Sequence, residues 1–216
     1  LTVSYLRMIF VAMDADYFPR LSAAVGHTRE MNLLINRQIN MLVVLMTPFL
    51  IIFSLSLPLI IHVLYTSNFL VVVPMVLAAV PYMYFKSIYT PVAYISLAKG
   101  DSLIYMTLEL TYDVVFALCV IGGFLWKGFL GAGLGIMTAN LFDLVLITSF
   151  CYHHYHYRIN RATLRRCAVL FLLLLIGLFV ATQPSAFLRG TLGLGITLMV
   201  LPFAWPVLRQ VWKRRS

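Results

Sequence analysis

The chain has 216 residues, of which 62% are hydrophobic and only 11% are charged, and its mean hydropathy is +0.95. Soluble domains are about 45–50% apolar and about 25% charged, so this composition excludes a soluble fold and indicates a membrane protein. The 16 Lys and Arg residues exceed the 7 Asp and Glu residues, which gives a net charge of +9.

Apolar runs long enough to cross a hydrocarbon core of about 30 Å, which takes about 20 helical residues, recur along almost the whole chain. In chain order they are the tail of a first helix at 1–13, full spans at 41–65, 69–98, 103–126 and 129–152, and a shorter closing hairpin at 167–182 and 191–208. Barrel strands would alternate polar and apolar residues, whereas these runs are continuously apolar. The sequence therefore predicts an all-α, polytopic transmembrane helix bundle with one partial and six full spanning helices.

Prolines fall inside two successive predicted spans, at positions 48, 58, 74, 81 and 91. Membrane helices tolerate such prolines because neighbouring groups satisfy the freed backbone carbonyls. We expect these helices to be kinked.

Basic residues gather in alternate loops. Twelve of the sixteen lie in the loop after the first helix, at Lys99, in the loop 153–166 and at the C-terminus, whereas the intervening loops hold only Lys127 and Arg189. The positive-inside rule then places these four basic regions, and the C-terminus, in the cytoplasm. Because topology accounts for the excess charge, we expect no nucleic-acid partner.

Ionisable residues inside predicted spans are functional candidates, because each costs about 2.5–3.5 kcal/mol near the bilayer centre. At 1.5 Å per residue, Lys86 and Asp113 both lie about 17 Å from the cytoplasmic ends of their spans, so we expect them to pair. Glu109 lies one turn from Asp113 on the same helical face. Asp143, with Asn140, occupies one face of the next span.

Two interpretations of these charges stay open. They form a buried structural network that joins three helices, or they line an aqueous cavity. In the second case Arg7, in the first helix, and Lys86 would meet an anionic group, and Glu109, Asp113 and Asp143 would carry coupling protons or sodium ions.

Other candidate chemistry is weaker. His153, His154 and His156 lie among tyrosines at a membrane boundary, where an aromatic belt is expected in place of a metal site. The glycines at 131, 133 and 135 do not match a nucleotide-binding fingerprint and favour close helix packing. No catalytic arrangement or large outward loop is present in the sequence, so we expect no enzyme and no cofactor.

Asn32, Asn36 and Asn40 recur every fourth residue and share one face of a polar segment, 31–40, that leads into the first full span. We interpret this segment as an interfacial helix near the lipid headgroups. Substrate contact is the alternative.

The segment Asp16-Tyr17-Phe18-Pro19-Arg20-Leu21-Ser22 resembles the loop after an even-numbered helix in O-antigen and lipid-linked oligosaccharide flippases. These flippases form the polysaccharide transporter family, within the multidrug/oligosaccharidyl-lipid/polysaccharide exporter superfamily. Further segments are similar to family turns and helix entries, at 36–38, 64–69, 97–100 and 128–135. The resemblance covers about residues 12–157, and the last hairpin matches only in hydropathy.

The resemblance implies a two-lobed, all-helical transporter of the bacterial inner membrane. Residues 1–157 would be the second lobe with its first helix truncated, and residues 158–216 a basic loop, a helix hairpin and a basic tail. We expect the first lobe to be missing from this chain, through truncation or a shortened gene.

Family members move undecaprenyl-pyrophosphate-linked oligosaccharide units from the cytoplasmic to the periplasmic leaflet during polysaccharide and O-antigen biosynthesis. The resemblance thus implies Arg7, and less directly Lys86, as pyrophosphate contacts. It also implies membrane lipids, a polysaccharide polymerase and chain-length proteins as partners. The alternatives are a cation-coupled multidrug exporter of the same superfamily, with Glu109, Asp113 and Asp143 as the coupling site, and a non-transporting scaffold of a polysaccharide-synthesis complex.

Overall fold

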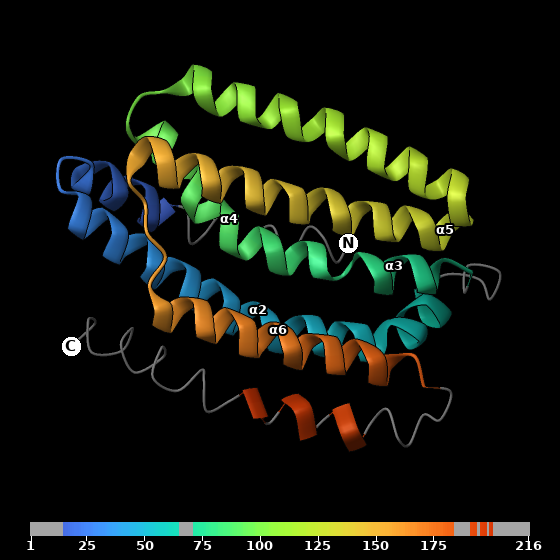
Figure 1. Cartoon of the computed structure of the whole chain (residues 1–216). Helices are drawn as coiled ribbons and strands as arrows, with labels where there is room; N and C mark the ends of the chain where they lie inside the picture. The colour runs from blue at the N-terminus through green and yellow to red at the C-terminus, as the bar shows by residue number, and fades with distance from the viewer. Residues whose placement is uncertain (1–14, 65–70, 184–190, 194, 198, 201–216) are drawn as a thin grey trace.

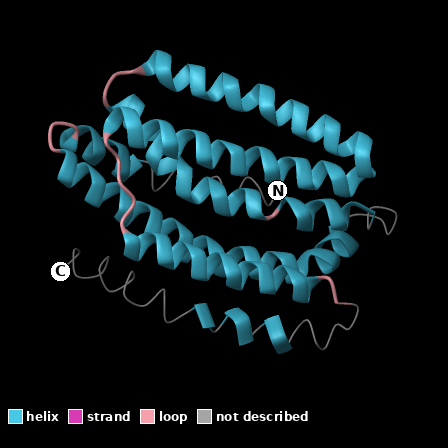
Figure 2. Ribbon diagram, viewed as in Figure 1, coloured by secondary structure: helices cyan, strands magenta, loops and turns pink. Residues whose placement is uncertain are grey.

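The computed structural model describes residues 15–64, 71–183, 191–193, 195–197 and 199–200. The described residues form helices and connecting turns, with no strand among them (Figures 1 and 2). The elements are a helical segment at 15–24, α2 (Thr28–Leu64), α3 (Val73–Ala79), α4 (Pro81–Ala98), α5 (Ser102–Tyr155) and α6 (Arg161–Ala181). The predicted all-helical class is confirmed.

Three of the described helices, α2, α5 and α6, are long and apolar enough to cross a membrane. These helices agree with the membrane protein that the composition predicts. The predicted number of one partial and six complete spans is not confirmed. The first predicted helix, 1–13, and much of the last, 191–208, lie outside the described residues.

Helix α5 is 54 residues long, but it consists of two antiparallel halves, 102–126 and 129–155 (Figure 1). The chain reverses at Lys127 and Gly128, whose backbone angles are not helical. Gly128 has a φ of +58°, a conformation that glycine adopts without the steric cost of a side chain. The predicted spans 103–126 and 129–152 correspond closely to these two halves.

The predicted span 69–98 divides into two helices, and its first two residues lie outside the described part of the chain. A short 3₁₀ turn at 71–72 leads into α3, and α4 begins at Pro81. Proline lacks the N–H that would continue the hydrogen-bond ladder of α3, so it starts a new helix instead. In contrast, Pro48 and Pro58 lie inside α2 without ending it.

The segment 16–22, predicted as a loop, is helical in the structure. Residues 15–24 form a helix, a turn follows at 25–26, and α2 begins at Thr28. Tyr17 is 4% exposed, and its hydroxyl donates a hydrogen bond to the carbonyl oxygen of Pro91 in α4 (2.8 Å). This buried contact holds the segment against α4 as a helix.

The core forms where α2 packs against α6 and α4, and where α4 and α3 pack against α5. A polar contact supports this packing, since the buried Tyr84 hydroxyl of α4 donates to the Cys167 carbonyl oxygen of α6 (2.6 Å). Lipid tails are as apolar as the side chains, so close fit rather than hydrophobicity holds membrane helices together.

Three glycines of the second half of α5 provide that close fit, as the sequence predicts. A Cβ atom added at Gly131 would collide with the Gly123 carbonyl oxygen in the first half, and one at Gly135 with that of Cys119. One added at Gly133 would collide with the Met75 carbonyl oxygen of α3. The first half of α5 and helix α3 therefore both approach the backbone of the second half directly.

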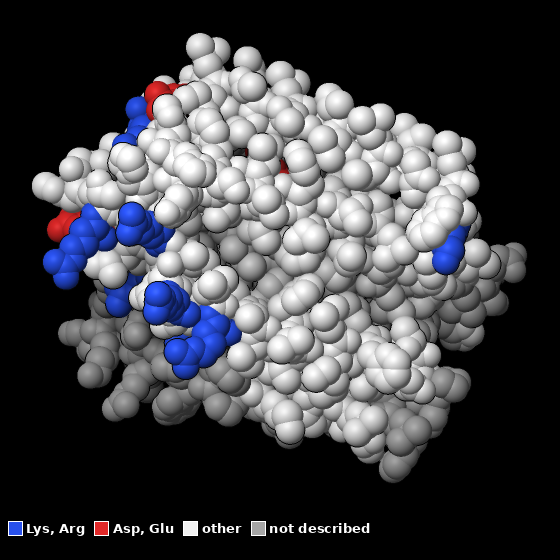
Figure 3. All heavy atoms as spheres, in the orientation of Figure 1, with Lys and Arg blue, Asp and Glu red and all other residues white. Residues whose placement is uncertain are grey.

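Basic side chains gather at one end of the molecule (Figure 3). The connections at this end are the turn before α2, the turn between α4 and α5, and the segment between α5 and α6. The described basic residues in or near them are Arg20, Arg29, Arg37, Lys99, Arg158, Arg161, Arg165 and Arg166. Lys127 lies at the bend of α5, which is the opposite end. The predicted asymmetry of charge is therefore present between the two ends of the described helices.

Candidate functional site

A buried polar cluster joins α4 to both halves of α5. Asn140, in the second half, is fully buried, and its Oδ1 accepts hydrogen bonds from the hydroxyls of Tyr89 in α4 (3.1 Å) and Tyr112 in the first half (3.3 Å). Its Nδ2 donates to the carbonyl oxygen of Ile136 (2.9 Å). One amide thus connects three helical segments, because its oxygen accepts from hydroxyls of two other segments.

Asp143 follows Asn140 by one helical turn and belongs to the same cluster. It is 3% exposed, and its Oδ1 atom has no hydrogen-bond partner. The Tyr89 hydroxyl lies beside the carboxyl group, and the charges of Glu109, Lys86 and Asp113 all act on it. The structure thus brings three of the predicted site residues into the surroundings of Asp143.

Lys86 and Asp113 do not pair, so this prediction is wrong. Neither residue forms an ion pair with a described residue. Lys86 is half-buried, and its Nζ atom lies 5.7 Å from the centre of the Tyr82 ring in the preceding turn. Asp113 is exposed, whereas Glu109 on the same helix is half-buried. Equal depth along two helices does not make two side chains face each other.

The cluster has two chemical properties. The hydrogen bonds of Asn140 join three segments, which supports the interpretation as a structural network. The Oδ1 atom of Asp143, which has no hydrogen-bond partner among the described residues, is also able to accept a proton or a cation. Buried ionisable groups of this kind in membrane proteins mark substrate or ion pathways.

Tyr89 and Tyr112 are members of the cluster that sequence reasoning did not single out. A signal for Tyr89 was present, because Tyr82, Lys86 and Tyr89 follow one another at helical spacing and share a face of α4. Tyr112 lies three residues after Glu109 on the same helix. Neither tyrosine stands out by composition alone in a chain with 12 tyrosines.

The segment 16–22, which carries the resemblance to flippases, makes contacts within the chain itself. Arg20 and Asp16 form an exposed ion pair one turn apart (3.0 Å), a contact worth about 0.3–0.5 kcal/mol. Phe18 packs edge-on against Tyr94 of α4, and Pro19 is exposed. Arg7, the predicted pyrophosphate contact, lies outside the described residues.

The asparagines of the polar lead-in bind the chain itself. Asn36 donates from Nδ2 to the carbonyl oxygen of Arg158 (3.1 Å) and accepts at Oδ1 from the backbone N–H of Asn160 (2.8 Å). Asn32 does the same one turn earlier, donating to the His156 carbonyl oxygen (3.4 Å) and accepting from the Arg158 N–H (3.3 Å). Their amides thus hold the non-helical segment 156–160 by its backbone groups.

The same row of amides continues into α6. Asn40 donates to the Thr163 hydroxyl (2.9 Å), and Asn160 caps α6 by accepting from the Ala162 N–H (3.2 Å). Helix α2 is continuous through this region, so the lead-in is part of the spanning helix itself. The asparagine row thus fixes the connection between α5 and α6.

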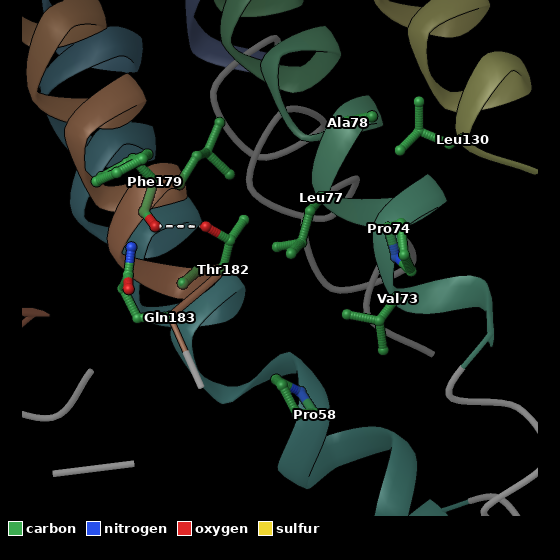
Figure 4. A pocket seen from close by; sticks show the side chains of 11 residues that line it. Pro58, Val73, Pro74, Leu77, Ala78, Leu130, Phe179, Thr182 and Gln183 are labelled. Carbon is green, nitrogen blue, oxygen red and sulfur yellow. Dashed lines mark hydrogen bonds between the residues drawn. The ribbon is translucent and has the colours of Figure 1, made fainter. Parts of the chain in front are cut away.

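An apolar cleft of about 550 Å³ lies towards the other end, between α2, α3, α5 and α6 (Figure 4). Pro58, Leu77, Leu130 and Phe179 line it, and the Thr182 hydroxyl at its edge donates to the Phe179 carbonyl oxygen (2.7 Å). The lining has no ionisable side chain, so the cleft offers no partner to an anionic group.

The histidines of the predicted aromatic belt contact the aromatic residues beside them. His154 stacks on Phe150 and touches the edge of Tyr155, and His153 meets Tyr152 edge-on. Within the described residues no group of three or more His, Cys, Asp or Glu side chains is arranged to hold a metal ion.

No protein-family model, no curated protein and no solved structure matches this chain. The resemblance of its motifs and the cluster around Asp143 are the features that bear on its function.

Proposed function

We propose that the chain is part of a transporter that flips undecaprenyl-pyrophosphate-linked oligosaccharide units across the bacterial inner membrane. The observation that carries the proposal is the charged cluster around Asp143, which lies in the middle of crossing-length helices. Charges at this depth are costly and mark a pathway for substrate or ions. The motif resemblance at 16–22 and 128–135 names the class of substrate.

In this proposal α3 and α4 together form one span, the two halves of α5 form two, and the basic end faces the cytoplasm. The eight basic residues at that end satisfy the positive-inside rule. The described helices then form one lobe of a transporter, and a second lobe completes the cavity. Rocking of the two lobes would expose the cavity to each side of the membrane in turn.

Lys86 supplies the cation that an anionic pyrophosphate requires within this cluster. It is half-buried, and no described carboxylate neutralises it by a direct ion pair. Arg7 would add a second cation from the first helix. Lipid-linked substrates enter from the membrane plane, so a site at this depth is within their reach.

The test replaces the two cations in the full-length protein, in cells whose surface polysaccharide depends on it. We expect Lys86→Ala and Arg7→Ala to abolish surface polymer, measured on immunoblots, while the protein still inserts in the membrane. Lys99→Ala is the matched control, because Lys99 lies at the exposed end of the same helix as Lys86. Normal polymer in both test variants would overturn the assignment.

A cation-coupled exporter of small molecules is the second candidate. The open Oδ1 atom of Asp143 favours it, since a coupling ion needs an acceptor that no other group occupies. In that case Asp143→Asn would abolish the gradient-dependent part of drug efflux and leave surface polymer intact. Loss of polymer without any change in efflux would favour the flippase.

A further inference from the structure

A second polar site lies far from the Asp143 cluster, at the basic end of the molecule. A pocket of about 510 Å³ opens between the first turn of α2 and the segment that connects α5 to α6. Arg29 lines it from α2, and Arg158 lines it from the connecting segment. Two arginine residues from different elements thus line one cavity.

The asparagine row builds this pocket. The amides of Asn32 and Asn36 form hydrogen bonds with backbone N–H and C=O groups of the connecting segment. These backbone groups are therefore already paired within the chain. The side chain of Arg158 is left exposed beside α2. The wall of the pocket is therefore fixed by several hydrogen bonds, although the arginines themselves are exposed.

The positive charge of the pocket is not neutralised by the protein. Arg29 and Arg158 form no ion pair with a described residue. Glu30 is the neighbour of Arg29 in sequence, and it pairs with neither of them. Arginine binds phosphate in a planar, two-pronged geometry, so two free guanidinium groups at one pocket favour a phosphate ligand.

The pocket also lies where the membrane boundary is expected. Arg158 follows the end of the apolar run at Tyr152 by six residues, and Tyr152 and its neighbouring histidines are the residues of the predicted aromatic belt. Leu33, which is 61% exposed, lines the same pocket. An exposed leucine beside two unpaired arginines fits a ligand that is charged on one side and apolar on the other.

We propose that this pocket binds the headgroup of an anionic phospholipid. Arg29 and Arg158 hold the phosphate, and Leu33 contacts the apolar part of the glycerol and the upper acyl chain. The bound lipid connects α2 to the segment between α5 and α6. This site is independent of the proposed transport function.

The experiment adds phosphatidylglycerol or phosphatidylcholine to the purified full-length protein in detergent and counts the retained lipids by native mass spectrometry. We expect the protein to retain phosphatidylglycerol in preference to phosphatidylcholine. The double variant Arg29→Ala with Arg158→Ala should lose about tenfold or more in affinity, because two phosphate contacts disappear together. Leu33→Ser, which keeps every charge, should weaken retention to a smaller extent.

The matched control is the double variant Arg161→Ala with Arg165→Ala, which removes the same charge at the same end but outside the pocket. Circular dichroism of each variant establishes that it is folded. An equal loss in the control would overturn the proposal, because binding would then depend on overall charge. Displacement of the lipid by inorganic phosphate alone would overturn it as well, since the site would then recognise a free anion.

Discussion

The two halves of α5 are similar in length and in apolar character, yet they face different surroundings. The first half, 102–126, is largely exposed, with Leu103 at 73% and Leu125 at 79%. The second half, 129–155, buries a row of side chains that includes Ala139 and Ile147. Hydropathy does not separate them, because lipid is as apolar as a protein interior. The halves differ in where their glycines lie, because Gly131, Gly133 and Gly135 of the second half are buried, whereas Gly122 and Gly123 of the first half are not.

The two aspartates of α5 show the same contrast. Asp143 in the second half is buried in the polar cluster, whereas Asp113 in the first half lies on the exposed face. A carboxylate facing lipid at this depth costs several kcal/mol, about 2.5 or more. We therefore expect the exposed face of the first half to line a water-filled space in the complete assembly.

The largest expected effect is on chemical accessibility. In a chain whose native Cys119, Cys151 and Cys167 are replaced by alanine, Asp113→Cys should react fully with a membrane-permeant thiol reagent. Asp143→Cys should react only after denaturation, because its side chain is 3% exposed. Mass spectrometry of the intact protein measures both. Equal reaction at the two positions would show that the halves do not differ as described.

The next effect tests the contact between the halves. Gly123→Val places a side chain against the backbone of Gly131, and we expect it to lower the free energy of unfolding by about 1–3 kcal/mol. Gly122→Val is the control, because a Cβ atom at this adjacent position meets nothing within 4 Å. Unfolding in mixed detergents, followed by circular dichroism, measures the two. A loss of the same size in both would show that the halves do not pack through Gly123.

The smallest effect concerns the hydrogen bonds of Asn140. Tyr89→Phe removes a hydroxyl that is buried, and we expect it to cost about 0.5–1.5 kcal/mol of unfolding free energy. Tyr112→Phe should cost less, because Tyr112 is half-buried and its bond is longer, at 3.3 Å. The same unfolding assay compares them. A larger loss of unfolding free energy for Tyr112→Phe than for Tyr89→Phe would contradict this order. It would mean that the hydrogen bond from the first half of α5 contributes more to stability than the exposure of Tyr112 indicates.

The sequence predicted the helices better than their contacts. Apolar runs located the two halves of α5 within a few residues, and the glycines at 131, 133 and 135 correctly indicated close packing. The segment 16–22 was predicted wrongly as a loop, because charged and proline residues near a span also suit a short amphipathic helix. Its helix depends on the contact of Tyr17 with Pro91, which lies 74 residues away and leaves no local signal.

The candidate site was predicted in part. The spacing of residues predicted similar depths for Lys86, Glu109 and Asp143, and in the structure Lys86 and Glu109 lie close enough to Asp143 for their charges to act on it. It did not give the direction of each side chain around its helix, and the pairing of Lys86 with Asp113 failed for that reason. Direction depends on which helices are neighbours, and that is a property of the tertiary fold.

The reversal at Gly128 has a consequence for how the protein is made. Because the two halves of α5 are adjacent in sequence, their contact can form once the 54 residues of α5 have left the ribosome, without waiting for distant helices. We expect the pair to enter the bilayer together as a hairpin. The hydroxyl of Tyr112 can then meet the amide of Asn140 during insertion, so that this costly polar group crosses the membrane with a partner already beside it.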